Sequence, residues 1–111
     1  MTNLEAVAAT IEPYSVSDDS MEKALIDAGA RFGSVDKDST YTLTEKKCVA
    51  LASMLCLSRL RVLVSENIGG ISQSYSVSKI EAAIKAIAND ADISSDLVLA
   101  DEDNTITCIS I

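Results

Sequence analysis

The chain has 111 residues, a hydrophobic fraction of 48%, only 4% aromatic residues, and no histidine. This length predicts one domain with a core of aliphatic side chains, and the absence of histidine excludes Ser-His-Asp and Cys-His catalysis, His-ligated metal sites and His-based pH switches. Seventeen acidic against nine basic residues give a net charge of −8, which argues against coating nucleic acid or binding an anionic membrane, because both use clustered Lys and Arg.

Two short helices are predicted in the first third of the chain. Apolar residues at helical spacing predict the first over Leu4–Ile11, with Asn3 as its N-cap. The second is predicted over Met21–Ala28, after a polar stretch whose residues 17–19 can supply the cap. Gly29 follows it directly and is expected to stop it.

A long central helix is predicted next. Thr42-Leu43-Thr44-Glu45 fits the capping box that opens a helix, and the helical pattern then continues to about Val64. The middle of this segment is apolar nearly all round, so we expect it to be covered by neighbours on several sides. Near its end Arg59 and Arg61 are about 200° apart around the helix axis.

The three cysteines are Cys48, Cys56 and Cys108. Their odd number and the absence of a C-x-x-C pair favour buried free thiols over a disulfide or a metal site. The longest apolar run, Cys48–Leu57, is far shorter than the ~18 residues of a membrane span. The first nine residues carry Glu5 and no basic side chain, unlike a signal peptide. We therefore expect a soluble protein inside the cell.

The stretch from Ser65 to Val77 reads S-E-N-I-G-G-I-S-Q-S-Y-S-V and is the most distinctive of the chain. The Gly pair favours a tight turn. After it, serines alternate with larger side chains, which favours an extended loop or an irregular hairpin. Ser78-Lys79-Ile80-Glu81 fits a second capping box, which predicts a fourth helix ending at Asn89.

The last part of the chain differs in composition, with six acidic and no basic residues between Asp90 and Asp103. Leu97–Leu99 is consistent with a short helix or a strand. The β-branched run Thr105–Ile111 favours a strand that could pair with the sheet edge of another chain, or a frayed tail. We divide the chain into a helical domain, residues 1–90, and an acidic extension, residues 91–111, that would order on assembly.

No motif for chemistry stands out. There is no phosphate-binding Gly motif, no calcium-loop spacing and no nucleophile signature, so we expect no catalytic residue, cofactor or metal. Arg59, Arg61 and Glu66 allow two interpretations: a solvated helix end with weak surface ion pairs, or a contact between subunits, at which Arg is enriched.

The order of these segments resembles the small head-tail connector (adaptor) proteins of tailed bacteriophages and prophages. The resemblance covers Met1 to Asp90, and includes a capped D-D-x-x-x-x-A-L-I-D-A helix, the long helix and the loop after it. Its most specific part is Ser65–Ser76, with the pattern E-x-x-G-x-x-S-x-S-Y. Members of that family are mainly helical and form rings beneath the portal, where they extend the DNA channel and receive the next tail-completion protein.

The resemblance also implies positions for an inter-subunit or portal contact. The loop residues that would shape it are Glu66, Gly69, Gly70, Ser74 and Tyr75, and Arg59 and Arg61 would lie near it. The acidic tail after Asp90 is not part of the family pattern. At the position of Gly70, an acidic residue would fit the loop of that family equally well.

Together these observations predict an all-α domain of about four helices around one long central helix, with minor strand in residues 65–77 or in the tail. The function implied is structural: a homo-oligomeric ring, assembled by head-to-tail contacts at the virion head-tail junction after synthesis in the bacterial cytoplasm. Its partners would be the portal and tail-completion proteins, with DNA passing through unbound, and with no membrane, cofactor or enzymatic activity. The alternative is a small acidic helical adaptor or regulator that binds a basic protein.

Overall fold

The structure, a computed structural model, describes residues 1–66 and 77–98, with the backbone alone for residues 63–66. Within these ranges the chain forms helices and no sheet; a single isolated bridge joins Thr2 to Thr40. The predicted all-α class is confirmed. The elements are α1 (Asn3–Thr10), α2 (Asp18–Phe32), the 3-10 turn η1 (Leu43–Glu45), α3 (Lys46–Glu66) and α4 (Val77–Ala91).

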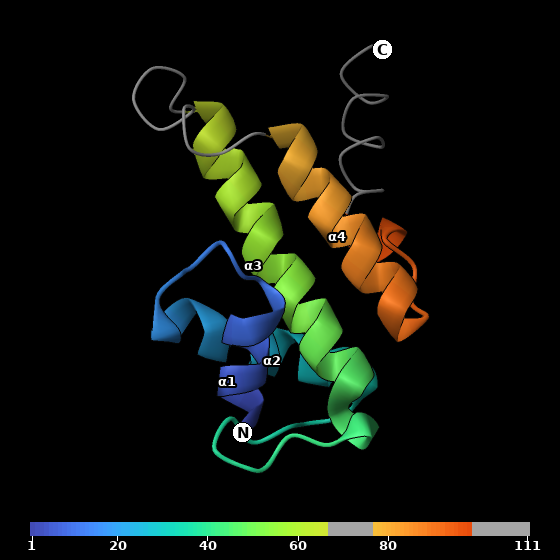
Figure 1. Cartoon of the computed structure of the whole chain (residues 1–111). Helices are drawn as coiled ribbons and strands as arrows, with labels where there is room; N and C mark the ends of the chain where they lie inside the picture. The colour runs from blue at the N-terminus through green and yellow to red at the C-terminus, as the bar shows by residue number, and fades with distance from the viewer. Residues whose placement is uncertain (67–76, 99–111) are drawn as a thin grey trace.

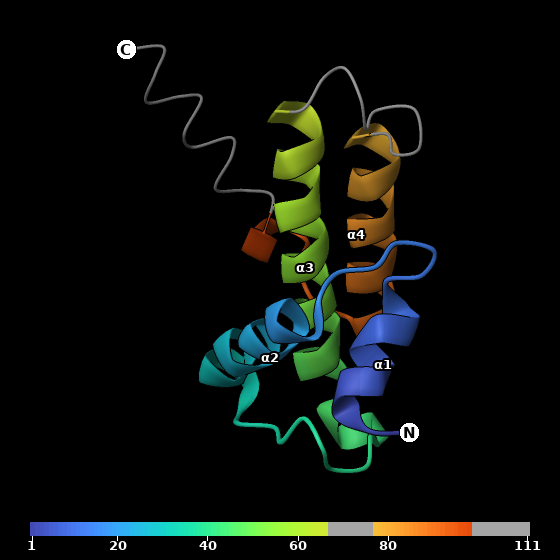
Figure 2. The ribbon, with the colours of Figure 1, turned by 90° about the vertical axis from the view of Figure 1, so that its left-hand side faces the viewer.

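The long helix α3 is the centre of the molecule and packs against α1, α2 and α4 (Figure 1). Helix α4 runs antiparallel to it, and α1 and α2 lie beside its first half. The second half of α3 and the first half of α4 therefore extend beyond α1 and α2 as a projecting pair of helices, which both views show (Figure 2).

The core surrounds the middle of α3. All seven residues from Cys48 to Met54 are buried, so this stretch is covered on every side, as its apolar composition predicts. A fully buried aliphatic side chain contributes about 1.5–3 kcal/mol. The large ones that are below 2% exposed come from all four helices or their ends: Val7, Ile11, Leu25, Met54, Leu57, Ile80 and Ile84.

Helix α1 begins one residue earlier than predicted. Thr2, not Asn3, is the N-cap: its hydroxyl accepts a bond from the Glu5 N–H at 3.1 Å, and the Glu5 carboxylate accepts from the Thr2 N–H at 2.8 Å. Asn3 is instead buried, and its Nδ2 donates to the Asp36 carbonyl at 2.8 Å. The side chain that looked like a cap thus ties the loop after α2 to α1.

Helix α2 is capped by Ser17, as predicted, but it runs past Gly29 to Phe32. The predicted stop at Gly29 is therefore wrong. The glycine is explained by the close approach of the returning chain, because a Cβ there would lie 3.1 Å from the Ser34 Cα. Gly33 ends the helix with φ +103°, a conformation that side chains rarely adopt.

The two later helices begin differently. The predicted contact between Thr42 and Glu45 is present: the Thr42 N–H donates to the carboxylate at 3.1 Å, and one 3-10 turn precedes α3. Helix α4 already begins at Val77, one residue before the predicted N-cap Ser78. The Glu81 carboxylate accepts a bond from Arg61. The predicted ends at Val64 and Asn89 each fall two residues short of the observed ends.

Core packing continues beyond the predicted domain boundary at residue 90. Helix α4 ends at Ala91, and Ile93, Leu97 and Val98 pack against the core after a turn through Asp92, whose φ is +59°. The expected strand or hairpin in residues 65–77 and in the tail falls largely on residues 67–76 and 99–111, outside the described residues; Ser65, Glu66 and Val77 are helical.

Candidate subunit interface

Arg61 and Glu81 join the two helices of the projecting pair. Arg61 is 8% exposed, and its guanidinium donates to the Glu81 carboxylate at 2.9 Å. The arginine end of this bond is buried and the Glu81 side chain is 36% exposed, and a charge-assisted bond of this length is stronger than one between neutral groups. Arg61 therefore serves the fold, by holding α3 to α4 near the ends from which residues 67–76 depart.

Arg59 faces away from this contact. It is exposed and has no ion pair within the described residues, unlike Arg61. It lines a groove of about 250 Å³ at the base of the projecting helices, where the chain before α2 crosses α3. The other lining residues are three apolar ones, Val16, Cys56 and Leu60, and three serines, Ser15, Ser17 and Ser20.

This groove joins two segments that the sequence does not connect. Arg59 is a predicted contact residue, whereas the Ser15–Ser20 stretch is predicted only to be a loop and a cap. Val16 is the available signal, because it is the single apolar residue within that polar stretch and it packs against the core. Its contact with α3 depends on the path of the loop, which no local pattern specifies.

The cysteine nearest to Arg59 is chemically quiet. Burial raises the pKa of the Cys56 thiol to about 11, although the positive charge of Arg59 acts in the opposite direction. Burial, and then the Glu45 carboxylate, also raise the pKa of the Cys48 thiol. Both thiols are free and buried, as predicted, whereas Cys108 lies outside the described residues. A protonated, buried thiol is a poor nucleophile and a poor metal ligand.

The predicted loop contact residues are only partly described. Glu66 is the last residue of α3, whereas Gly69, Gly70, Ser74 and Tyr75 lie outside the described residues. The structure thus places the supports of that loop, α3 and α4, and leaves its predicted contacts as expectations.

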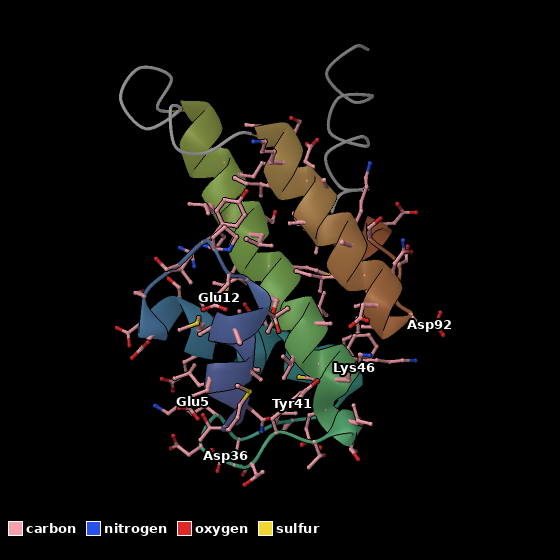
Figure 3. All side chains as sticks on the ribbon, viewed as in Figure 1. Glu5, Glu12, Asp36, Tyr41, Lys46 and Asp92 are labelled. Carbon is pink, nitrogen blue, oxygen red and sulfur yellow. The ribbon has the colours of Figure 1, made fainter. Side chains whose placement is uncertain are left out.

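A second groove lies at the opposite end of α3. It has a volume of about 210 Å³ and is lined in part by Tyr41, Lys46 and Ile87 (Figure 3). The Lys46 ammonium lies 3.4 Å from the Asp90 carboxylate, which joins the start of α3 to the end of α4. The Lys46 side chain is about one-third exposed and that of Asp90 is mostly exposed, so this ion pair contributes little stability.

A model of a protein family described as a family of unknown function (DUF6706) matches residues 1–111 of the chain. The chain belongs to this family. No curated protein and no solved structure matches it.

Two further observations concern the described residues of this DUF6706 member. In residues 1–66 and 77–98, no three His, Cys, Asp or Glu side chains gather in a way that could hold a metal ion. No helix in the same ranges is long and apolar enough to cross a membrane.

Proposed function

We propose that the protein is a structural subunit of a phage or prophage head-tail connector, and that it assembles into a ring with the portal protein as its template. The observation that carries this proposal is Arg59, an exposed cation without an ion pair in the described part of the chain, at the edge of a groove lined by apolar residues and serines. The molecule around it has a net charge of −8. A neighbouring copy therefore offers many carboxylates to this groove.

Such a contact is of the head-to-tail kind. The groove at Arg59 and an acidic surface of the next copy are different patches, so each subunit can give one and receive the other. Heterologous contacts of this type close into rings when the rotation between neighbours divides the circle. The ring architecture expected from the resemblance is thus compatible with the distribution of charge.

The projecting helices support the same proposal. Residues 67–76 connect the ends of these two helices in the sequence, and the Arg61–Glu81 bond braces the helices against each other at 2.9 Å. A rigid support lowers the entropy lost when a loop is fixed at an interface. These residues include the E-x-x-G-x-x-S-x-S-Y pattern on which the resemblance mainly rests.

The decisive experiment is sedimentation velocity and electron microscopy of the purified protein, alone and mixed with the portal protein of the same phage or prophage. We expect rings on the portal, and a loss of affinity of about 10-fold or more for Arg59→Glu, because an interfacial charge is reversed. Lys85→Glu is the control, since Lys85 is exposed on α4 and makes the same change of charge.

Failure to bind the portal at any salt concentration would overturn the connector proposal. The alternative, a small acidic adaptor that binds a basic protein, makes a different prediction for the same variants. A basic partner would contact carboxylates, so Arg59→Glu would leave its binding unchanged or strengthen it.

A further inference from the structure

A third groove, between α2 and α3, lies where the described part of the chain ends. It has a volume of about 530 Å³, larger than the two grooves above. Leu51 and Leu55 of α3 and Leu97 after α4 give it an apolar lining, and Asp27, Ala30 and Arg31 of α2 form its other side. Leu55 and Leu97 are only half-buried, so apolar surface is left open to solvent.

Arg31 is the cationic side chain in the lining of this groove. Arg31 is exposed and has no ion pair within residues 1–66 and 77–98. Asp27, the acid beside it, is already engaged by the Lys23 ammonium at 2.7 Å. Asp96 is the nearest acid along the chain from Leu97; it is exposed, and it also forms no ion pair in the described part. The groove therefore suits a segment in which apolar residues are followed by acidic ones.

The chain itself continues with such a segment. Val98 is 8% exposed and packed against the core, and the next residues read Leu99-Ala100-Asp101-Glu102-Asp103. Three to five residues of extended chain reach about 10–17 Å beyond Val98. The three carboxylates are thus tethered within reach of the groove, at an effective concentration in the millimolar range.

We propose that the groove between α2 and α3 is the docking site of the chain's own residues 99–103. Leu99 would cover the apolar lining formed by Leu51 and Leu55, and the carboxylates of residues 101–103 would pair with Arg31. This inference is independent of the connector proposal, because it concerns one chain and not its assembly.

A paramagnetic label tests the contact in the full chain. Asn104→Cys in a Cys108→Ser background places a nitroxide directly after the acidic residues, since Cys48 and Cys56 are buried and resist labelling. Backbone amide signals of Ala30, Leu51 and Leu55 should then broaden in NMR spectra. Signals from the groove near α1 and α4, at Thr10, Tyr41 and Ala86, are the internal control and should keep their width.

Two charge variants make the test specific. Arg31→Glu, and the triple change Asp101→Asn, Glu102→Gln, Asp103→Asn, should each reduce the broadening at least threefold, whereas Lys85→Glu should leave it unchanged. Circular dichroism establishes that each variant is folded. Equal broadening of both grooves, or broadening that persists in Arg31→Glu, would overturn the proposal.

A mixed sample separates docking within one chain from docking between copies. Isotope-labelled protein without a nitroxide is mixed with unlabelled protein that carries it. Docking on the same chain predicts no broadening in the mixture. Broadening that persists in the mixed sample would mean that a second copy occupies the groove, and would also overturn the proposal.

Discussion

At the scale of single residues, Arg59 and Arg61 show how position decides the role of a side chain. They are two residues apart, which separates them by about 200° around α3. Arg61 is buried against Glu81, and Arg59 is exposed at a groove. The sequence predicts that the two point in different directions. It does not predict which one is buried, because that depends on a carboxylate supplied by another helix.

This difference predicts unequal effects on stability. Arg61→Ala should lower the free energy of unfolding by about 2–4 kcal/mol, because it removes a buried side chain and its ion pair, whereas Arg59→Ala should change it by less than about 0.5 kcal/mol. Urea unfolding measures both. Glu81→Gln should also destabilise, because it removes the negative charge to which the Arg61 guanidinium donates. Equal losses for the two arginine variants would contradict the structural role of Arg61.

The buried thiols give a prediction on reactivity and pH. In a Cys108→Ser variant, Cys48 and Cys56 should react slowly with a thiol reagent at pH 8 until urea unfolds the protein.

Because the pKa of Cys56 is raised to about 11 from an ordinary 9.0, the folded state keeps the thiol proton to a higher pH than the unfolded state does. Its contribution to stability is complete below about pH 9 and is lost as the pH rises towards 11. Cys56→Ala should reduce this loss; an unchanged alkaline profile would contradict it.

At the scale of elements, the sequence predicts the four helices and their order, but not their ends. The pattern of Met21, Leu25 and Ala28 identifies the buried face of α2 correctly. The glycine that follows is a misleading stop signal, because a close approach of Ser34 and a chain reversal both select glycine. Whether a glycine marks a close approach or a chain reversal depends on tertiary contacts, which the local sequence does not specify.

Gly29 and Gly33 should therefore respond differently to the same substitution. Gly33→Ala should cost about 1–3 kcal/mol, because its φ of +103° strains any side chain although no atom lies within 4 Å of the added Cβ. Gly29→Ala gains about 1 kcal/mol of helix propensity, but its Cβ would lie 3.1 Å from the Ser34 Cα and would force that backbone to shift, so we expect the two effects to oppose each other and the net change to be smaller than at Gly33. Urea unfolding of both variants measures the difference. A stabilising Gly33→Ala would show that the cap conformation is not retained.

At the scale of the whole molecule, composition predicts the class, and contacts between distant segments decide the sites. The all-α class and the central helix follow from hydrophobic periodicity. The groove at Arg59 combines α3 with the loop before α2, and the groove at Arg31 combines α2, α3 and Leu97. Neither combination has a sequence pattern, since each forms only when the helices pack. The predicted loop contacts at Ser74 and Tyr75 remain predictions of the resemblance.

The net charge of −8 predicts opposite effects of salt on the stability of the monomer and on its assembly. Exposed acids such as Glu5, Glu12, Asp36 and Asp92 are distributed over the surface (Figure 3), and their mutual repulsion weakens as salt screens it. Raising NaCl from 10 mM to 0.5 M should therefore stabilise the monomer, by on the order of 1 kcal/mol. The same salt should weaken portal binding, because the contact at Arg59 is attractive.

The control for this prediction is the double variant Glu12→Gln, Asp92→Asn. Both residues are exposed, and Asn tolerates the positive φ of residue 92. The variant removes two negative charges without touching an ion pair of the described residues, so it should reduce the stabilisation by salt and leave the core intact. Thermal or urea unfolding at both salt concentrations provides the measurement. If salt destabilised the monomer, the local ion pairs would outweigh the general repulsion, and the opposite response of stability and assembly would be lost.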